Sequence, residues 1–340
     1  MPFNPAAALV SISLASKLAA AAAKDRDRIA GSLKDDRSPV TVADLAVQAL
    51  ITLTLRTLGD SHIHRLVAEE SGATLEGDEG ALIGNEVLAL LKKALAPTDI
   101  AAVTPKSVAE VRAILDGGDF QPTANETEPY WCLDPIDGTK GFLRGGQFAL
   151  ALALIEKNEP VFGVLGCPHL PLGQASDYGA IDPYGSTYVG MDGFAGSAAG
   201  APDTLDAFGA IHVTNTPKES VVRTCLSYEK AHSDKDRTSA LLEEAGVSIE
   251  PIRIDSQCKY AMVASGRADL YLRLARGEYR EKSWDHAAGT AVVRAAGGVV
   301  EDMAGTPLAF KDRLLDTTGG ICVRTPAITL STPPSPDSLH

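Results

Sequence analysis

The segment that most constrains this chain is residues 131–140, WCLDPIDGTK. It predicts an apolar strand that ends in two carboxylates, Asp134 and Asp137. Carboxylate oxygens are the ligands that hard divalent cations such as Mg²⁺ prefer. Gly138 lets the backbone come close to a ligand, and Thr139 places a hydroxyl beside the two acids. The segment therefore predicts a corner that can hold metal and activate water.

The length and charge of the chain narrow the classes of protein to which it can belong. Its 340 residues suffice for one large domain or two ordinary ones. A net charge of −13 argues against binding to nucleic acid or to anionic membranes. A negative protein can still bind a phosphate if metal ions lie between its carboxylates and the substrate. We therefore expect a small-molecule substrate, no nucleic-acid or membrane partner, and a monomer.

The cysteines and the N-terminus bear on the compartment. The five cysteines are odd in number, widely spaced and without a CxxC motif. This pattern argues against a disulfide framework and a zinc site, and favours a reducing compartment, the cytosol. Residues 6–23 come nearest to a membrane span, but serines and Lys17 interrupt them. No basic region precedes them, so we expect an amphipathic helix rather than a signal peptide.

The first part of the chain predicts helices followed by strands. Thr41 is the expected N-cap of the second helix, with Asp44 in its first turn. Asn158-Glu159-Pro160 predicts a hairpin, and 191–207 a loop or linker. The expected elements are helices over 5–30 and 42–58, a strand over 65–68, an insertion over 73–118 with helices near 84–95 and 105–115, and strands over 130–133, 148–156 and 161–166.

The second part alternates between strands and helices, which indicates an α/β unit. The expected elements are strands over 221–228, 269–274 and 298–302 and helices over 235–245, 256–265 and 284–296. The predicted division is an N-terminal α+β domain over 1–210, a C-terminal α/β domain over 211–330, and a Pro- and Ser-rich tail over 331–340.

Six carboxylates stand at the end of a predicted strand or the start of a predicted helix: Asp44, Glu69, Glu70, Asp134, Asp137 and Asp285. Taken singly, most of them are better explained as helix N-terminal acids or as a solvated charge pair. Brought together, they would repel one another unless cations lay between them. Bound Mg²⁺ would remove that repulsion and create a site for phosphoryl oxygens.

Three motifs occur in a recognisable order: Glu69-Glu70-Ser71, Asp134-Pro-Ile-Asp-Gly-Thr139 and Trp284-Asp-His-Ala-Ala-Gly289. Together they resemble the inositol monophosphatase superfamily and span most of the chain. The resemblance implies a layered αβαβα sandwich (α+β or α/β) with the active site between two subdomains. It also implies an Mg²⁺-dependent phosphomonoesterase that is sensitive to lithium and sodium.

Smaller signals resemble one branch of that superfamily, the 3′(2′),5′-bisphosphate nucleotidases. They are Lys140-Gly141 after the central motif and the segments 38–44, 231–233, 255–260 and 269–273. The branch implies hydrolysis of adenosine 3′,5′-bisphosphate to AMP and phosphate, as in sulfate assimilation. 3′-Phosphoadenylyl sulfate is the implied second substrate, since only its 5′ substituent differs.

The resemblance also implies roles for single residues. Two or three Mg²⁺ ions would be bound by Glu69, Asp134, the Ile136 carbonyl, Asp137 and Asp285. Asp44 and Thr139 would relay a proton from the attacking water, and Glu70 would support a metal-bound water. The substrate would be contacted by Thr139, His232, Ser256, Lys259, Arg273 and Asp285. Lys259 offers a point charge and Arg273 a planar fork, which suit a second phosphate. His232 would contact the nucleoside.

Two alternatives remain open on sequence. An inositol mono- or polyphosphate 1-phosphatase would share the metal ligands but not the roles of His232, Lys259 and Arg273. An inactive, metal-binding regulatory homologue would need a broken water relay, yet Asp44 and Thr139 are both present. The sequence gives no function for the insertion over 73–118.

Overall fold

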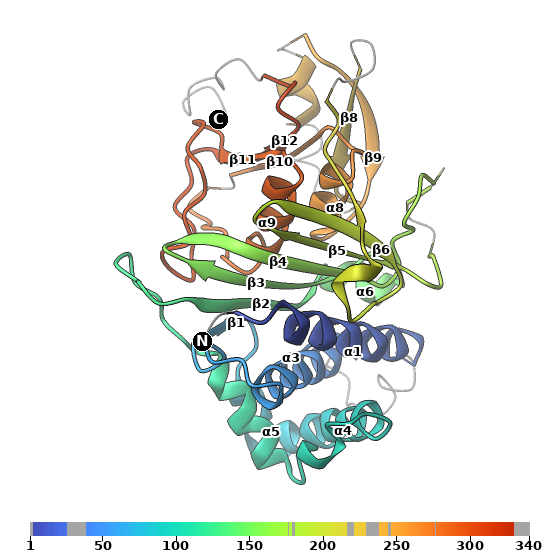
Figure 1. The fold of residues 1–340 in the computed structure, drawn as a ribbon, viewed down its shortest axis with the longest axis vertical. Helices are drawn as coiled ribbons and strands as arrows, with labels where there is room; N and C mark the ends of the chain where they lie inside the picture. Colours follow the sequence, from blue (N-terminus) through green and yellow to red (C-terminus); the bar gives the residue numbers. More distant parts are fainter. Residues whose placement is uncertain are drawn as a thin grey trace.

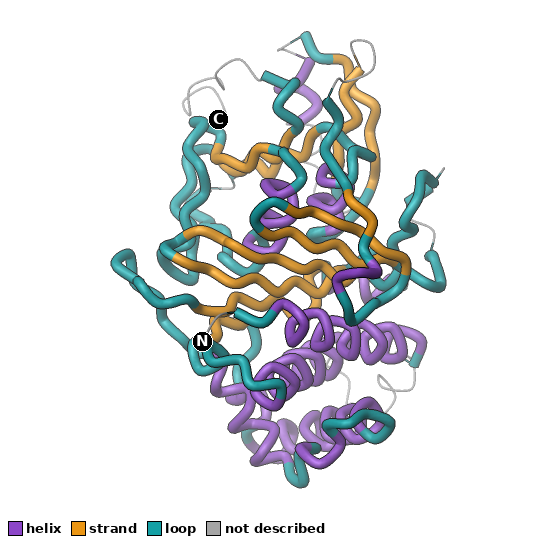
Figure 2. Tube along the Cα trace, viewed as in Figure 1, coloured by secondary structure: helices purple, strands orange, loops and turns teal. Residues whose placement is uncertain are grey.

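Two β-sheets alternate with layers of helices in the computed structural model of the protein (Figure 1). The structure describes residues 3–25, 39–175, 177–178, 181–215, 221–228, 238–243, 246–275 and 277–329. The alternation confirms the expected αβαβα sandwich (Figure 2). In order, the layers are α1 (Pro5–Lys24) with α3 (Pro39–Thr57), a seven-stranded sheet, α8 (Cys258–Ala264) with α9 (Ala287–Ala295), a five-stranded sheet, and a helical stretch at 238–243.

The N-terminal helices α1 and α3 lie side by side on the outer face of the first sheet (Figure 1). Asn4 caps α1, because its side chain accepts a hydrogen bond from the Ala6 N–H at 3.1 Å. Helix α3 begins at Pro39, so the expectations that Thr41 is its N-cap and that Asp44 lies in its first turn are wrong. Proline suits the first helical position, because its fixed φ matches the helix and the N–H that it lacks would have no partner within the helix.

Helix α1 is long and apolar enough to cross a membrane, judged by length and composition alone. Of its most apolar window, 67% is buried inside the protein. Its buried side chains join one hydrophobic cluster with those of α3 and the first sheet. A buried core helix has the same composition as such a span.

The first sheet holds its strands in sequence order, and only β1 and β2 pair in parallel. Lys157 and Asn158, both with positive φ, turn β3 into β4, which confirms the expected hairpin. Part of the expected linker is instead a strand, β6, because its small residues pair through the backbone and carry little strand signal of their own. The strands are β1 (Leu66–Ala68), β2 (Tyr130–Asp137), β3 (Ala149–Glu156), β4 (Glu159–Cys167), β5 (Ser186–Met191), β6 (Phe194–Ala199) and β7 (Gly209–Ala210).

The second sheet has the order β11-β12-β10-β8-β9, with β8 parallel to both of its neighbours. Sequence reasoning missed β9 and β12. The polar edge strand β9 shows no alternation, and β12 follows a long irregular segment. The strands are β8 (Val221–Leu226), β9 (Ser248–Arg253), β10 (Leu270–Leu274), β11 (Val299–Asp302) and β12 (Gly320–Arg324).

Helix α9 packs closely on the first sheet because a glycine of the sheet lies at the contact. A Cβ added at Gly163 would lie 2.5 Å from the Ala288 carbonyl oxygen and 2.7 Å from the Ala291 Cβ. Only a residue without a side chain allows that approach. This contact fixes the first part of α9 over β4.

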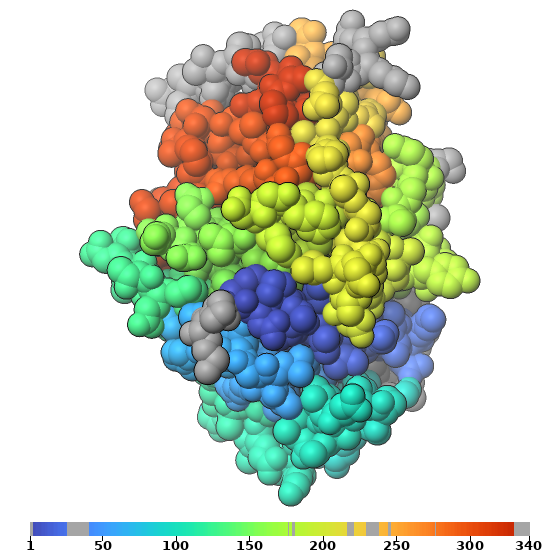
Figure 3. Space-filling view, viewed as in Figure 1, coloured from blue at the N-terminus to red at the C-terminus, as the bar shows by residue number. Residues whose placement is uncertain are grey.

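The insertion forms an outer helical layer against α3, at the opposite end of the molecule from the second sheet (Figure 3). Its helices are α4 (Gly77–Leu95) and α5 (Val108–Leu115), close to the expected ranges. Short helices among the described residues are η1 (Gly72–Leu75), η2 (Ala101–Val103), η3 (Asp116–Gly118), α6 (Thr139–Arg144) and η4 (Leu205–Ala207). All five cysteines are free and buried.

Candidate metal and anion site

Two parallel strands bring the first acids together. Ala68 of β1 lies opposite Leu133 of β2, so the residues that follow them meet at one edge of the sheet. Glu69 and Asp134 lie close enough there for each carboxyl group to shift the pKa of the other. Asp44 of α3 lies near the same two acids: burial, and then the charges of Glu70 and Glu69, raise the pKa of Asp44 well above its usual range.

Glu70 is held by its backbone. Gln48 of α3 donates from Nε2 to the Glu70 carbonyl at 2.7 Å, and the Glu70 N–H donates to Gln48 Oε1 at 3.0 Å. This double hydrogen bond ties α3 to the end of β1. It fixes the position of the acidic pair relative to Asp44, which lies one helical turn before Gln48.

Strand β2 is longer than expected and carries both of its aspartates. Its register with β3 shifts between Asp134 and Asp137, as in a bulge. Gly138 follows with a left-handed backbone, φ 91°, and a Cβ there would lie 2.8 Å from the Ser256 Cβ. This close approach joins the first half of the chain to the second. Thr139 is exposed and begins α6.

Asp285 arrives from the second half, in the turn ahead of α9. The helix begins at Ala287, so Asp285 precedes it rather than opening it. Gln257 fixes the turn: its Nε2 donates to the Trp284 carbonyl at 2.9 Å, and its Oε1 accepts from the Gly289 N–H at 3.0 Å. The Gln257 backbone N–H also donates to the Asp137 carboxylate. One residue thus connects the acids of both halves.

The carboxyl groups of this cluster have raised pKa values, because nearby positive charge does not balance them. Burial first, and then Glu69, Asp137, Asp285 and Asp44, raise the pKa of Asp134 far above its usual range. Burial and Asp137 raise the pKa of Asp285 to about 8, and burial and Glu69 raise that of Glu70 to about 7. Burial raises the pKa of Asp137 to about 6 against the lowering effect of Lys259.

Two oxygens of this cluster have no hydrogen-bond partner. They are Oδ1 of Asp44 and Oδ1 of Asp134, and both side chains are buried, at 5% and 1% exposure. Buried polar atoms in proteins are nearly always satisfied. A hard divalent cation bound by oxygens would satisfy them and relieve the repulsion, so the residues present fit such an ion.

The raised pKa values predict how stability depends on pH. In the folded protein Glu70 and Asp285 keep their protons up to about pH 7 and about pH 8, whereas the unfolded chain releases them near 4.5 and 3.8. The folded state therefore binds more protons between these limits, and its stability falls as pH rises through them. In EDTA the melting temperature should decrease from pH 5 to pH 8.5.

Added Mg²⁺ should reverse that trend, because cations bind the deprotonated carboxylates. The stabilisation by Mg²⁺ should therefore be larger at pH 8.5 than at pH 5. Scanning calorimetry at both pH values, with and without Mg²⁺, measures both effects. A metal-free protein whose melting temperature rises over this interval would contradict the assignment of the cluster.

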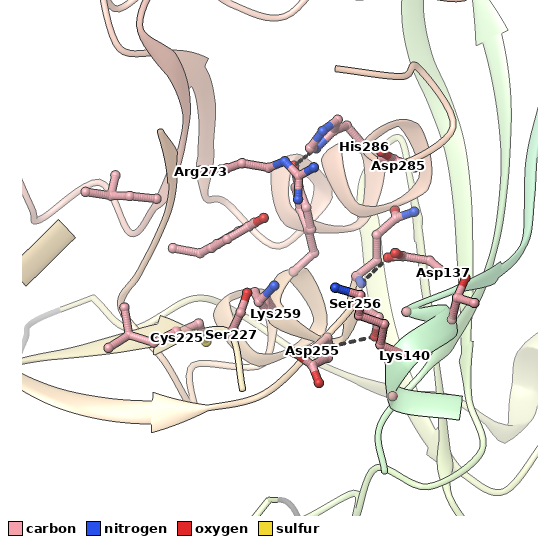
Figure 4. A pocket seen from close by; sticks show the side chains of 18 of the residues that line it. Asp137, Lys140, Cys225, Ser227, Asp255, Ser256, Lys259, Arg273, Asp285 and His286 are labelled. Atoms are coloured by element: carbon pink, nitrogen blue, oxygen red, sulfur yellow. Dashed lines mark hydrogen bonds between the residues drawn. The ribbon is translucent and has the colours of Figure 1, made fainter. Parts of the chain in front are cut away.

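A cavity of about 330 Å³ opens beside the acids and is shared by both halves of the chain. Figure 4 shows Asp137 and Lys140 on the first half facing Ser256, Lys259 and Arg273 on the second. Lys259 is buried, and its Nζ lies 4.9 Å from the centroid of the Tyr271 ring. The cavity therefore brings together acids that can hold cations and cations that can hold an anion.

Arg273 is fixed by a chain of polar contacts. Its Nε lies 2.7 Å from Glu281 Oε2, and His286 Nε2 lies 3.4 Å from the same oxygen. Tyr260 Oη and His286 Nδ1 are 2.7 Å apart. Burial opposes the charge on Glu281, but the interactions with His286 and Arg273 outweigh it and lower the pKa of Glu281 to about 2. The spacing of a metal site is also found among Glu281, Asp285 and His286. Arg273, however, already neutralises the charge of Glu281 there.

Most residues expected in the site meet at this cavity or at the acidic edge. His232 lies outside the described residues. Ser256 lines the cavity, but α8 begins only at Cys258, two residues after the start of the helix expected over 256–265. Ser256 instead has a left-handed backbone, φ 62°, a conformation that a serine rarely adopts. The Ile136 side chain is buried, and the role of its carbonyl stays a prediction.

Sequence reasoning missed the residues that hold the site in place. Gln257 and His286 lie inside the segments 255–260 and 284–289 and could have been singled out there. Gln48 and Glu281 show no signal of their own, because their partners belong to other elements.

Comparisons with known proteins agree with this geometry. The profile of the Inositol monophosphatase family matches residues 4–329. A protein from Oryza sativa named 3′(2′),5′-bisphosphate nucleotidase is 37% identical over 324 residues, 93% of this chain and 88% of that one. One of the same name from Dictyostelium discoideum is 37% identical over 84% of this chain and 80% of that one.

Solved structures support the fold. CysQ from Bacteroides thetaiotaomicron, a bacterial member of the same family, superposes with a TM-score of 0.59 at 20% identity, covering 96% of this chain and 98% of that one. SuhB from Mycobacterium tuberculosis gives a TM-score of 0.53 at 19% identity, over 94% and 90% of the two chains.

Proposed function

The chain belongs to the inositol monophosphatase family, and from that membership we propose that it is a metal-dependent 3′(2′),5′-bisphosphate nucleotidase. It hydrolyses the 3′-phosphate of adenosine 3′,5′-bisphosphate to give AMP and phosphate. The observation that carries the substrate is the shared cavity, in which Asp137 and Asp285 lie together with Lys259 and Arg273. A substrate with two phosphates needs acids that hold metal ions at one phosphate and cationic side chains at the other. We propose a cytosolic location, because free cysteines suit a reducing compartment.

The acidic side of the cavity takes the phosphate that is cleaved. Two or three Mg²⁺ ions would be held by Glu69, Asp134, the Ile136 carbonyl, Asp137 and Asp285. When bound, Mg²⁺ lowers the pKa of water and neutralises phosphoryl oxygens. The shortage of positive charge and the two unpartnered oxygens support this assignment.

The chain itself supplies the proton relay and the second phosphate site. The Thr139 hydroxyl accepts a proton from the attacking water and passes its own to Asp44, while Glu70 orients water at the acidic edge. The water oxygen bonds to phosphorus in line, the bond from phosphorus to the ribose 3′-oxygen breaks, and that oxygen leaves as a hydroxyl after it takes a proton from solvent. Lys259, Arg273 and Ser256 hold the 5′-phosphate, and His232 contacts the nucleoside. 3′-Phosphoadenylyl sulfate fits the same site, because only its 5′ substituent differs.

A comparison of substrates tests this function. Phosphate release should be measured under single-turnover conditions from adenosine 3′,5′-bisphosphate and from inositol 1-phosphate. We expect kcat/KM to be at least roughly 100-fold higher for the nucleotide, because only that substrate engages Lys259 and Arg273, and each charge-assisted contact contributes about 1.5–3 kcal/mol. Equal or faster release from the inositol phosphate would overturn the assignment.

Lithium should inhibit the enzyme. A monovalent ion that enters one of the acidic positions would leave the cluster without enough charge to stabilise the leaving oxygen. Millimolar LiCl should therefore reduce phosphate release, while KCl at the same concentration serves as the control for ionic strength. Equal effects of the two salts would count against cation competition at these acids.

A further inference from the structure

A segment near the C-terminus crosses from the first sheet to the turn that carries Asp285. We name residues 310–315 the strap. At its beginning, Phe310 N–H donates to the Asn158 carbonyl at 2.8 Å, and the Tyr130 hydroxyl donates to the Phe310 carbonyl at 2.6 Å. At its other end, Ser283 N–H donates to the Arg313 carbonyl at 2.9 Å. The strap therefore joins both halves of the chain beside the acids.

Arg313 extends from the strap to the edge of the first sheet. Its Nη2 donates to the Ala68 carbonyl at 2.7 Å, and its Nη1 to the carbonyls of Gly118 and Phe120 at 3.3 and 3.4 Å. Its guanidinium carbon lies 4.9 Å from the centroid of the Trp284 ring. The planar fork of arginine suits several carbonyls and a ring face at once.

The partners of Arg313 adjoin acids of the site on both halves. Ala68 directly precedes Glu69, and Trp284 directly precedes Asp285. The guanidinium of Arg313 therefore lies between the Ala68 carbonyl, which precedes Glu69, and the Trp284 side chain, which precedes Asp285.

Arg313 also connects the insertion to the site. The chain returns from the insertion at Gly118, whose added Cβ would lie 2.9 Å from the Ala68 Cβ. Asp119 then forms an antiparallel bridge with Val67 of β1. Arg313 donates to the carbonyls on both sides of Asp119 and to the Ala68 carbonyl at the end of β1. The same side chain therefore binds both the returning chain and β1.

We propose that Arg313 is a positioning residue for the divalent-cation site: it holds the backbone before Glu69 against the turn that bears Asp285, and so sets the spacing of acids from the two halves. This inference rests on the proposed function insofar as those acids bind Mg²⁺. Groups that orient metal ligands from behind commonly change metal affinity 10- to 100-fold when they are removed.

Arg294 is a matched control. It is also an arginine of the second half that pairs with an acid of the first sheet, Glu159 of β4. Its Nη2 donates to the carbonyls of Val300 and Leu308 at 3.3 and 3.4 Å. Its partners do not adjoin the acids of the site, so its loss should lower stability without changing metal affinity.

The experiment compares the full-length wild type with Arg313→Ala, Arg313→Lys and Arg294→Ala. Mg²⁺ affinity is measured by titration calorimetry without substrate, and the melting temperature with and without Mg²⁺. We expect Mg²⁺ to bind Arg313→Ala about 10- to 100-fold more weakly than wild type. Arg313→Lys should lie between the two, because an ammonium keeps the charge but lacks the fork. Arg294→Ala should bind Mg²⁺ within about twofold of wild type.

Two results would overturn the proposal: wild-type Mg²⁺ affinity in Arg313→Lys and Arg313→Ala, or an equal loss of affinity in Arg294→Ala. If Arg313→Ala fails to fold, the lysine variant alone decides, since it is expected to lose affinity measurably. If the wild type binds Mg²⁺ but does not hydrolyse the bisphosphate, the proposed function is contradicted. The effect of Arg313 on Mg²⁺ affinity would still be valid in that case.

Discussion

Replacing Asp134 by Asn should abolish metal-dependent phosphate release while raising the stability of the metal-free protein. Asp134 is 1% exposed and faces repulsion from several acids, so its charge is costly in the absence of cations. A metal site stabilises the reacting phosphate by several kcal/mol, and each 1.36 kcal/mol changes the rate tenfold. We therefore expect a loss on the order of 10³-fold in kcat. At pH 8.5 in EDTA, the variant should melt above the wild type.

The increase in melting temperature on adding Mg²⁺ should also shrink or vanish in Asp134→Asn, because a neutral amide is a poor ligand for a hard cation. Asp316→Asn is the control, since Asp316 is a surface carboxylate that pairs with Arg280 and does not line the cavity beside the acids. It should leave both activity and the Mg²⁺ effect unchanged. If Asp134→Asn keeps a tenth or more of the Mg²⁺-dependent activity, Asp134 is not a metal ligand.

Replacing Arg273 by Ala should separate substrates with one phosphate from those with two. Arg273 lines the cavity, and its Nε forms an ion pair with Glu281 Oε2 at 2.7 Å; we expect its terminal nitrogens to bind the anion. A hydrogen bond to a charged group contributes about 1.5–3 kcal/mol, so the loss of this contact should raise KM for adenosine 3′,5′-bisphosphate roughly 10- to 150-fold. KM for adenosine 3′-monophosphate should change little.

Two further variants make this test specific. Arg280→Ala removes a neighbouring surface arginine that pairs with Asp316, and it should leave both KM values as they are. Arg273→Met combined with Glu281→Gln removes the carboxylate that Arg273→Ala would leave buried without its cation. The double variant should show the same preference for the monophosphate. Equal losses on the two substrates would place the 5′-phosphate elsewhere.

The chemistry of the site was predictable because its ligands come in short local motifs. Asp134 and Asp137 fall within one segment of four residues, and Glu69 and Glu70 are adjacent. Helices α4 and α5 and the β3–β4 hairpin also follow from local periodicity and turn residues. By contrast, β9 lacked the alternation that marks a strand, and it became one only by pairing with β8.

The groups that can bind metal and phosphate are evident from local sequence, because residue type decides ligand chemistry and the motifs keep their members close along the chain. How those groups meet depends on the folded chain. Gln257 joins Asp137 to the Asp285 turn across more than a hundred residues, and Arg313 joins Ala68 to Trp284 in the same way. Contacts of this kind depend on how the two sheets stack, and no local pattern records that.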